Sequence, residues 1–306
     1  MTLLDEVAGT ALFETSGRTW TWGDVFLAAR LWGQWEPWLD SVRDRESPDD
    51  PRAAEVAFRR ERRLISADEL RDWLAARRLT VDDWRAWVRG EPGETWTAGI
   101  CSGVFDRWAE QLAERAAAAA AADPPLRPAA LPSAWSARLA DDDDPRRADE
   151  LWYAERAYEK LCQFAGDRDA VARTIASTGT DWLRGDFDLL EAGDEDVARE
   201  AALLVRADGM NLDDAARTAG LSLASGSVYV ADIDADLRPR LMSAAPGELV
   251  GPVPLKSRDT FALAHVRAKV EPSIDDPDVA SRAAHVAVGA ALERAVREEV
   301  RWHDRD

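Results

Sequence analysis

The sequence predicts an α+β protein with a helical N-terminal part, a mixed C-terminal part and a long terminal helix. Up to residue 122, apolar residues recur at three- and four-residue spacing, which is typical of amphipathic helices. From residue 181, short stretches of alternating polarity, which are typical of strands, are interspersed with short helical patterns. Residues 277–303 form one helical pattern, and we expect that helix to pack back on the N-terminal helices.

These patterns divide the chain into five segments. They are a helical module at 1–122, a Pro- and Asp-rich linker at 123–147, a connecting helix at 148–180, a mixed domain at 181–271 and a C-terminal helix at 272–306. The linker prediction rests on the prolines between 123 and 145 and on the acidic run Asp141 to Asp144, because both favour exposed irregular chain.

Three polar residues, each followed three positions later by a carboxylate, mark helix starts in the N-terminal module. The pairs are Thr21 with Asp24, Ser66 with Glu69 and Thr80 with Asp83. Further helices are expected at 53–64 and 100–122, where the sequence Asp-Pro-Pro ends the second, and one long helix is expected at about 148–175.

The mixed domain is expected to begin with a strand at 182–190, followed by helices at 194–207 and 212–219. A second strand at 227–231 precedes a short helix that contains Leu237, Leu241 and Met242. A turn at Pro246-Gly247 then leads to a last strand at 260–266. The predicted order is βααβαβ.

The chain has 14 tryptophans, and most of them precede Phe105. Five lie on predicted apolar helix faces, where packing between helices is the expected role: Trp22, Trp32, Trp73, Trp84 and Trp108. Four others fall outside those faces: Trp20, Trp35, Trp38 and Trp96. We expect these four to be the candidates for a surface groove, because aromatic residues are favoured anchors for peptide ligands.

The net charge of −19 makes nucleic acid and anionic membranes poor partners, whereas a neutral or basic peptide is tolerated better. No apolar segment approaches the length that spans a bilayer. Asp5 and Glu6 stand where an export signal would carry basic residues. We therefore expect a cytoplasmic protein.

No cofactor or metal site is expected from the sequence. Cys101 and Cys162 are far apart and lack a nearby His, so buried free thiols are the expectation. The acidic clusters lack the Gly and closing Glu of an EF-hand loop. Phosphate-loop and dinucleotide fingerprints are absent from the sequence.

Two stretches resemble the SurA and PpiC group, in which a helical chaperone module surrounds a parvulin domain. Residues 62–90, RRLISADELRDWLAARRLTVDDWRAWVRG, resemble the paired helices of the chaperone module. Residues 182–270 resemble the parvulin domain, and Pro246 to Val253, PGELVGPV, is the most specific piece. The resemblance implies a protein that binds extended peptides.

A parvulin holds a prolyl peptide beside two facing strand histidines. The resemblance places the first near Phe187 or Asp188 and the second near Phe261 or Ala262, so both histidines are missing here. His265 is expected to point to the opposite face of its strand. The peptide-binding candidates that the resemblance implies are Phe187, Asp188, Tyr229, Leu241, Met242, Leu249, Val253 and Phe261. For any single apolar member of this set, core packing is the alternative.

The leading hypothesis is a cytoplasmic, chaperone-like protein with an inactive parvulin domain that binds a peptide or an unfolded polypeptide. Parvulin-related peptide maturation proteins suggest a ribosomally made precursor as the client, with a modifying enzyme or a second copy as further partners. One alternative is an enzyme that performs elimination or cyclisation in the same groove with Asp, Arg, Tyr229 or His265. Another alternative is weak prolyl isomerisation by shape and desolvation alone.

Overall fold

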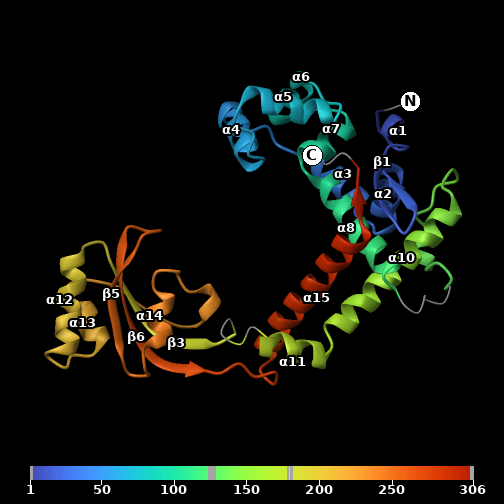
Figure 1. The fold of residues 1–306 in the computed structure, drawn as a ribbon. Helices are drawn as coiled ribbons and strands as arrows, with labels where there is room; N and C mark the ends of the chain where they lie inside the picture. The colour runs from blue at the N-terminus through green and yellow to red at the C-terminus, as the bar shows by residue number, and fades with distance from the viewer. Residues whose placement is uncertain (1–2, 92, 123–128, 178, 180–181, 304–306) are drawn as a thin grey trace. The chain divides into compact units, whose positions relative to one another are not determined.

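The computed structural model describes residues 3–91, 93–122, 129–177, 179 and 182–303. Contacts divide the chain into two compact units. Unit 1 comprises residues 1–163 and 289–306, and unit 2 comprises residues 164–288 (Figure 1). Among the described residues, no helix is both long and apolar enough to cross a membrane.

Unit 1 is mainly helical, as predicted. Its helices are α1 (Leu3–Val7), α2 (Trp22–Leu31), α3 (Trp35–Arg43), α4 (Pro51–Glu61), α5 (Ala67–Ala76), α6 (Val81–Val88), α7 (Thr95–Cys101), α8 (Val104–Ala120), α9 (Ser133–Ser136) and most of α10 (Pro145–Ala165). The helix expected at 100–122 is two helices, because Gly103 takes a left-handed conformation with φ of 70° between α7 and α8.

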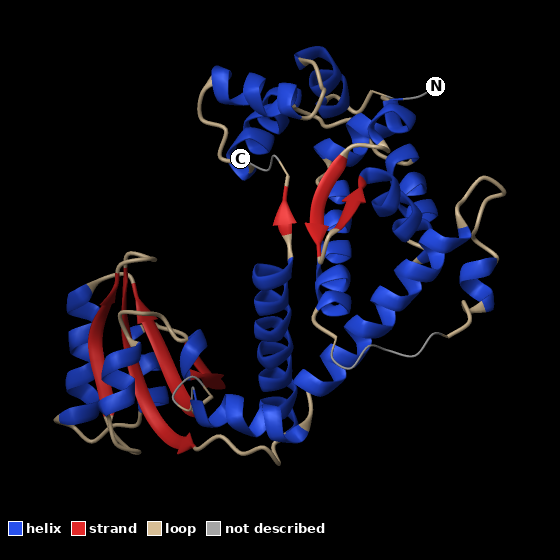
Figure 2. Cartoon of the chain, turned by 45° about the vertical axis from the view of Figure 1, so that its right-hand side comes forward, coloured by secondary structure: helices blue, strands red, loops and turns tan. Residues whose placement is uncertain are grey.

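The N-terminal module also contains a small sheet, and the expectation of helices alone was wrong here. β1 (Ala11–Thr15) and β2 (Arg18–Thr21) form an antiparallel hairpin, and β7 (Arg301–Trp302) pairs with the other side of β1 (Figure 2). Ser16 and Gly17 both have positive φ, as the tight turn of a two-residue hairpin loop requires. The end of the chain after the terminal helix therefore returns to the N-terminal module.

All three predicted helix starts are present. Thr21, Ser66 and Thr80 each accept a hydrogen bond from the backbone N–H three residues later. In each case the carboxylate at that later position accepts a hydrogen bond from the backbone of the capping residue. These reciprocal bonds fix the first turns of α2, α5 and α6.

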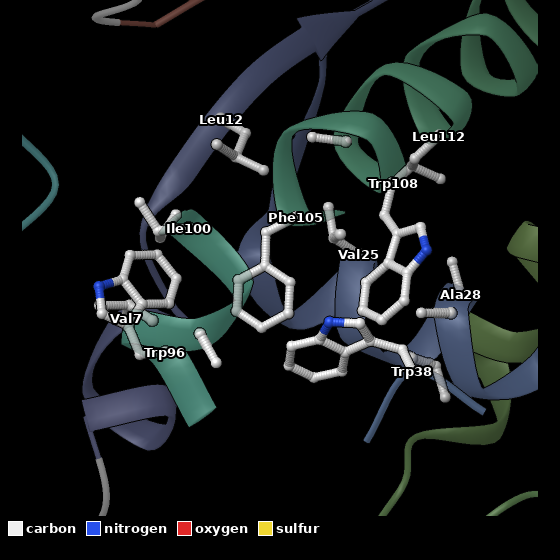
Figure 3. Packing of buried hydrophobic residues seen from close by; sticks show 14 of the residues in the cluster. Val7, Leu12, Val25, Ala28, Trp38, Trp96, Ile100, Phe105, Trp108 and Leu112 are labelled. Atoms are coloured by element: carbon white, nitrogen blue, oxygen red, sulfur yellow. The ribbon is translucent and has the colours of Figure 1, made fainter. Parts of the chain in front are cut away.

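The core of unit 1 is an aromatic cluster around Phe105, which is fully buried (Figure 3). Trp84 and Trp108 are buried in this core, and Trp22, Trp32 and Trp73 pack against it, as predicted. The expectation that Trp20, Trp38 and Trp96 line a surface groove was wrong, because each is at most 8% exposed. Trp35 is partly buried against the same core. Tertiary packing therefore extends beyond the helix faces that the sequence pattern marks.

The described part of the predicted linker contributes to the core of unit 1. Trp135, in α9, is buried and meets the Trp152 ring of α10 with centroids 5.2 Å apart. Residues 123–128 of that predicted segment lie outside the described residues. The two thiols are free, and Cys101 is buried, which raises its pKa to about 12. Cys162 is only partly buried.

Unit 2 is an antiparallel sheet with helices on both faces. After α11 (Arg168–Ser177), its elements are β3 (Arg184–Ala192), α12 (Glu195–Arg206), α13 (Leu212–Ala219), β4 (Leu223–Tyr229), α14 (Arg238–Ser243), β5 (Leu249–Leu255), β6 (Thr260–Val270) and the first half of α15 (Pro277–Glu299). The strand order is β4-β3-β6-β5. α12 and α13 cover one face, and α14 lies on the other (Figure 1).

The α+β class and the predicted order of helices and strands are confirmed, with two corrections. A fourth strand, β5, occupies the segment after the Pro246-Gly247 turn, so the order is βααβαββ. A bulge between Val250 and Val253 interrupts the strand. The apolar residues of β5 therefore do not alternate regularly along the sequence, and the strand pattern is hidden. The long helix expected at 148–175 is also two helices, α10 and α11.

Candidate functional site

A cavity of about 250 Å³ lies between the sheet of unit 2 and the segment that leads into α14. Its walls come from β3, β4, β6, the end of β5 with the turn that follows it, and the chain from Asp232 to Leu241. Apolar side chains form most of the lining: Phe187, Leu189, Val228, Ile233, Leu237, Leu241, Leu255 and Ala264. The cavity is thus a pocket on the face that the longer helices leave free.

The alternation of β3 decides which side chains face this cavity. Phe187 and Leu189 point to the α14 side, whereas Leu190 packs against α12 and α13 on the other side. Gly185 precedes Phe187 by two positions on the same face, and a Cβ at that glycine would collide with the Phe187 ring. The missing side chain therefore allows the ring to lie back along its own strand.

β4 forms the open wall of the cavity. It pairs with β3 on one side, and no described strand pairs with its other side. Ala224, Gly226 and Val228 face the cavity, and Gly226 lies opposite Phe187. Nothing lies within 4 Å of the position that a Cβ on Gly226 would take. The strand edge and the space above Phe187 are therefore both accessible.

The rim of the cavity is acidic. Asp232 accepts two hydrogen bonds of 2.7 Å from Arg282, and these bonds hold the pKa of Asp232 below its usual range. Asp234 accepts bonds from the backbone N–H of Asp236 and from the Ser257 hydroxyl, and they also lower its pKa.

Glu191 completes the acidic rim and pairs with Arg258 at 2.8 Å. Arginines therefore pair with two of the three lining carboxylates, while Asp234 accepts hydrogen bonds from neutral donors and leaves the rim slightly negative. This balance favours neutral or basic ligands over acidic ones.

Asp188 and His265 come together on the opposite face of the sheet. The Asp188 carboxylate accepts a hydrogen bond of 2.6 Å from the Ser225 hydroxyl and lies 3.5 Å from His265 Nδ1 and 3.3 Å from Arg267 Nε. The serine is bonded to the carboxylate, not to the imidazole, so the arrangement lacks the serine-to-histidine contact that activates a nucleophile. The prediction that His265 points away from the Ala262 side is confirmed.

The structure separates the eight predicted peptide-binding residues. Only Phe187 and Leu241 line the cavity. Val253 and Met242 belong to the apolar cluster on the same side of the sheet, and Val253 is buried. Tyr229 packs against the cluster around Trp182, with Arg282 over its ring at 4.6 Å.

The other three predicted residues do not lie on the cavity side. Leu249 packs with Leu190 and Leu263 on the face of the sheet that α12 and α13 cover. Phe261 points to the same face, because it alternates along β6 with Leu263 and His265. Asp188 is on that face also. The peptide-binding role of the eight residues stays a prediction.

The sequence analysis missed most of the cavity lining. Leu189, Gly226, Ile233, Leu237 and Arg258 were not among the candidates. Strict alternation from Phe187 would have indicated Leu189 and Glu191. Gly226 lies opposite Phe187 because β4 pairs with β3, and a local sequence pattern does not predict that register.

The cavity lining contains no histidine and no cysteine. Among the residues that the structure describes, no three His, Cys, Asp or Glu side chains form a group that could hold a metal ion. What the arrangement offers chemically is an apolar pocket with an open strand edge beside it.

No protein-family model matches the chain, and a search of curated proteins finds no match. Among solved structures, the foldase protein PrsA from Lactococcus lactis is similar over 97% of this chain and 96% of its own, with 9% identity and a TM-score of 0.36. PrsA from Streptococcus pneumoniae covers 90% of this chain and 82% of its own, with 11% identity and a TM-score of 0.25.

A third similar structure comes from work on PEB4 and Cj1289, two SurA-like chaperones of Campylobacter jejuni. It covers 96% of this chain and 99% of its own, with 8% identity and a TM-score of 0.22. At these TM-scores the similarity carries no argument about function.

Proposed function

We propose that the protein is a cytoplasmic, chaperone-like peptide-binding protein whose unit 2 holds an extended polypeptide segment without isomerising it. The observation that carries this proposal is the apolar cavity beside the open edge of β4, with no histidine in its lining. A groove of this kind can bind a peptide by shape and backbone pairing, whereas it lacks the paired histidines that the parvulin resemblance associates with catalysis.

Backbone pairing with β4 explains how a peptide would be held. An extended segment can add to an exposed strand edge, where main-chain hydrogen bonds give affinity and pockets for alternate side chains give specificity. Ala224, Ser225, Gly226 and Val228 are all exposed. A segment paired with them would place one side chain beside Gly226, above the Phe187 ring.

The rim charges define the preferred client. Asp232 and Glu191 are each paired with an arginine, so the rim keeps a small negative charge at neutral pH that comes from Asp234. An apolar side chain flanked by neutral or basic residues fits this site best. The client that we propose, on the strength of the family resemblance in the sequence, is a ribosomally made precursor peptide that is held during its modification.

Filling the space above Phe187 tests the site. We expect Gly226→Val to weaken binding of an apolar, Lys-flanked peptide about tenfold or more, because the new side chain occupies the proposed position of the ligand side chain. Ser227→Val is the matched control, because this neighbouring exposed residue points to the opposite face of the same strand. Fluorescence anisotropy with labelled peptides measures both, and equal affinity of the two variants would remove the site from consideration.

The absence of histidines from the cavity predicts no prolyl isomerisation above the buffer rate. The barrier to rotation about the prolyl bond is about 20 kcal/mol, and lowering it requires groups that favour the twisted bond over the planar forms. A panel of prolyl tetrapeptides assayed with the purified protein measures the rate. A rate above buffer that Gly226→Val reduces would instead establish isomerisation in this cavity by shape and desolvation.

A further inference from the structure

The C-terminal end of α4, in unit 1, carries an exposed hollow of about 540 Å³. Three arginines and three aliphatic residues line it: Val56, Arg59, Arg60, Arg63, Leu64 and Ile65. Val56 is 65% exposed and Ile65 is 85% exposed. A basic, apolar hollow is unusual on a chain with a net charge of −19.

Packing of α4 does not depend on this hollow. The opposite side of the helix buries Phe58, whose ring lies 5.6–6.0 Å from the rings of Trp73, Trp84 and Trp87. That face fixes the helix on its neighbours, α5 and α6. Val56 and Ile65 are therefore left uncovered without a packing role that accounts for them.

The three arginines differ in what they contact. Arg59 donates to the carbonyl oxygens of Leu64 at 3.1 Å and Ile65 at 2.5 Å, so it stabilises the end of the helix. Within the described part of the chain, no carboxylate forms an ion pair with Arg60 or Arg63. The neighbouring Glu61 contacts Arg62 at 3.4 Å. Two exposed guanidinium groups therefore flank two exposed aliphatic side chains.

We propose that this hollow binds an acidic, amphipathic segment of another polypeptide. Carboxylates of the segment pair with Arg60 and Arg63, and an aliphatic residue packs on Val56 and Ile65. A second copy of this chain fits less well, since two bodies of charge −19 repel each other. A short peptide escapes most of that repulsion, because salt screens charges beyond about 8–10 Å.

The probe for this surface is a fluorescein-labelled peptide with Glu and Leu at helical spacing, and the control probe carries Lys in place of Glu. Binding is measured by anisotropy with the full chain. The test variant is Arg60→Glu with Arg63→Glu. The matched control is Arg85→Glu with Arg89→Glu, two exposed arginines at the end of α6 in the same unit. A third variant, Ile65→Ser, removes apolar contact without changing charge.

We expect the Glu/Leu peptide to bind the wild type and the control variant alike, and to bind the test variant about tenfold or more weakly. Ile65→Ser should weaken binding severalfold, and added salt should weaken it in the wild type. Equal binding to the test and control variants would overturn the proposal, as would equal binding of the Lys peptide. Self-association of the wild type that the test variant abolishes, without peptide binding, would assign the hollow to a second copy and overturn it as well.

Discussion

Phe105→Ala is expected to lower the free energy of unfolding of unit 1 by about 3–5 kcal/mol, the range for a large side chain lost from a packed core. Phe105 has no exposed surface, and six aromatic rings surround it at centroid distances of 5.1–6.2 Å. Gly99 lies so close to the ring that a Cβ there would collide with it. Truncation therefore leaves a cavity that rigid neighbours cannot fill.

Ile65→Ala is the control for this prediction. It truncates an apolar side chain of the same unit that is 85% exposed, so its effect should be small. Urea unfolding followed by tryptophan fluorescence reports mainly on unit 1, because among the tryptophans only Trp182 belongs to unit 2. Similar losses in the two variants would contradict the central role of Phe105 in the core.

Asp24→Ala is expected to destabilise unit 1 by about 3 kcal/mol, the upper end of the range for a buried polar group removed from its hydrogen-bond partners. The Asp24 side chain is 4% exposed and accepts a hydrogen bond of 2.9 Å from the backbone N–H of Thr21. Its other oxygen lies 3.7 Å from both Arg18 Nη2 and Arg147 Nε.

The contact with Arg18 explains why removal of Asp24 should cost more stability than removal of a helix cap alone. Its guanidinium lies over the Trp20 ring at 3.4 Å, and burial lowers its pKa although Glu150 and Asp24 both act to raise it. Without Asp24, this charge keeps its burial cost, with Glu150 at 2.7 Å as its remaining ion-pair partner and Arg147 as a like charge nearby.

Asp83→Ala provides the control for the buried network. Asp83 makes the same capping box with Thr80 at the start of α6, but its side chain is exposed. Its removal should cost about 1 kcal/mol, the usual value of an N-cap interaction. Urea unfolding of both variants separates capping from burial, and equal losses would show that the arginines around Asp24 contribute nothing.

The parts of the fold that local chemistry fixes were predicted from the sequence. Thr21, Ser66 and Thr80 start helices in the structure because a capping box needs only residues three positions apart. The opposite orientation of Ala262 and His265 followed from strand alternation alone. The β1–β2 hairpin was missed because its two strands are short and lie directly before the stronger helical pattern that begins at Trp22.

The residues expected to form one groove are divided between the two faces of the sheet. Phe187 and Leu241 line one cavity, whereas Asp188, Leu249 and Phe261 lie on the other face of the sheet, and a peptide-binding role of any of them stays a prediction. A shift of one residue along a strand reverses the face of a side chain. A resemblance that locates a position to within one or two residues therefore cannot assign the lining of a groove.

By itself, the sequence determined the α+β class, the capped helices, the order of the elements of unit 2 apart from β5, and the acidic charge of the protein. These properties depend on composition and on residues close together in the chain. Only the tertiary structure decided that Trp20, Trp38 and Trp96 are buried, that β7 completes the sheet of unit 1, and that Gly226 leaves space above Phe187. Each of these depends on contacts between segments distant in sequence, whose registers no local pattern specifies.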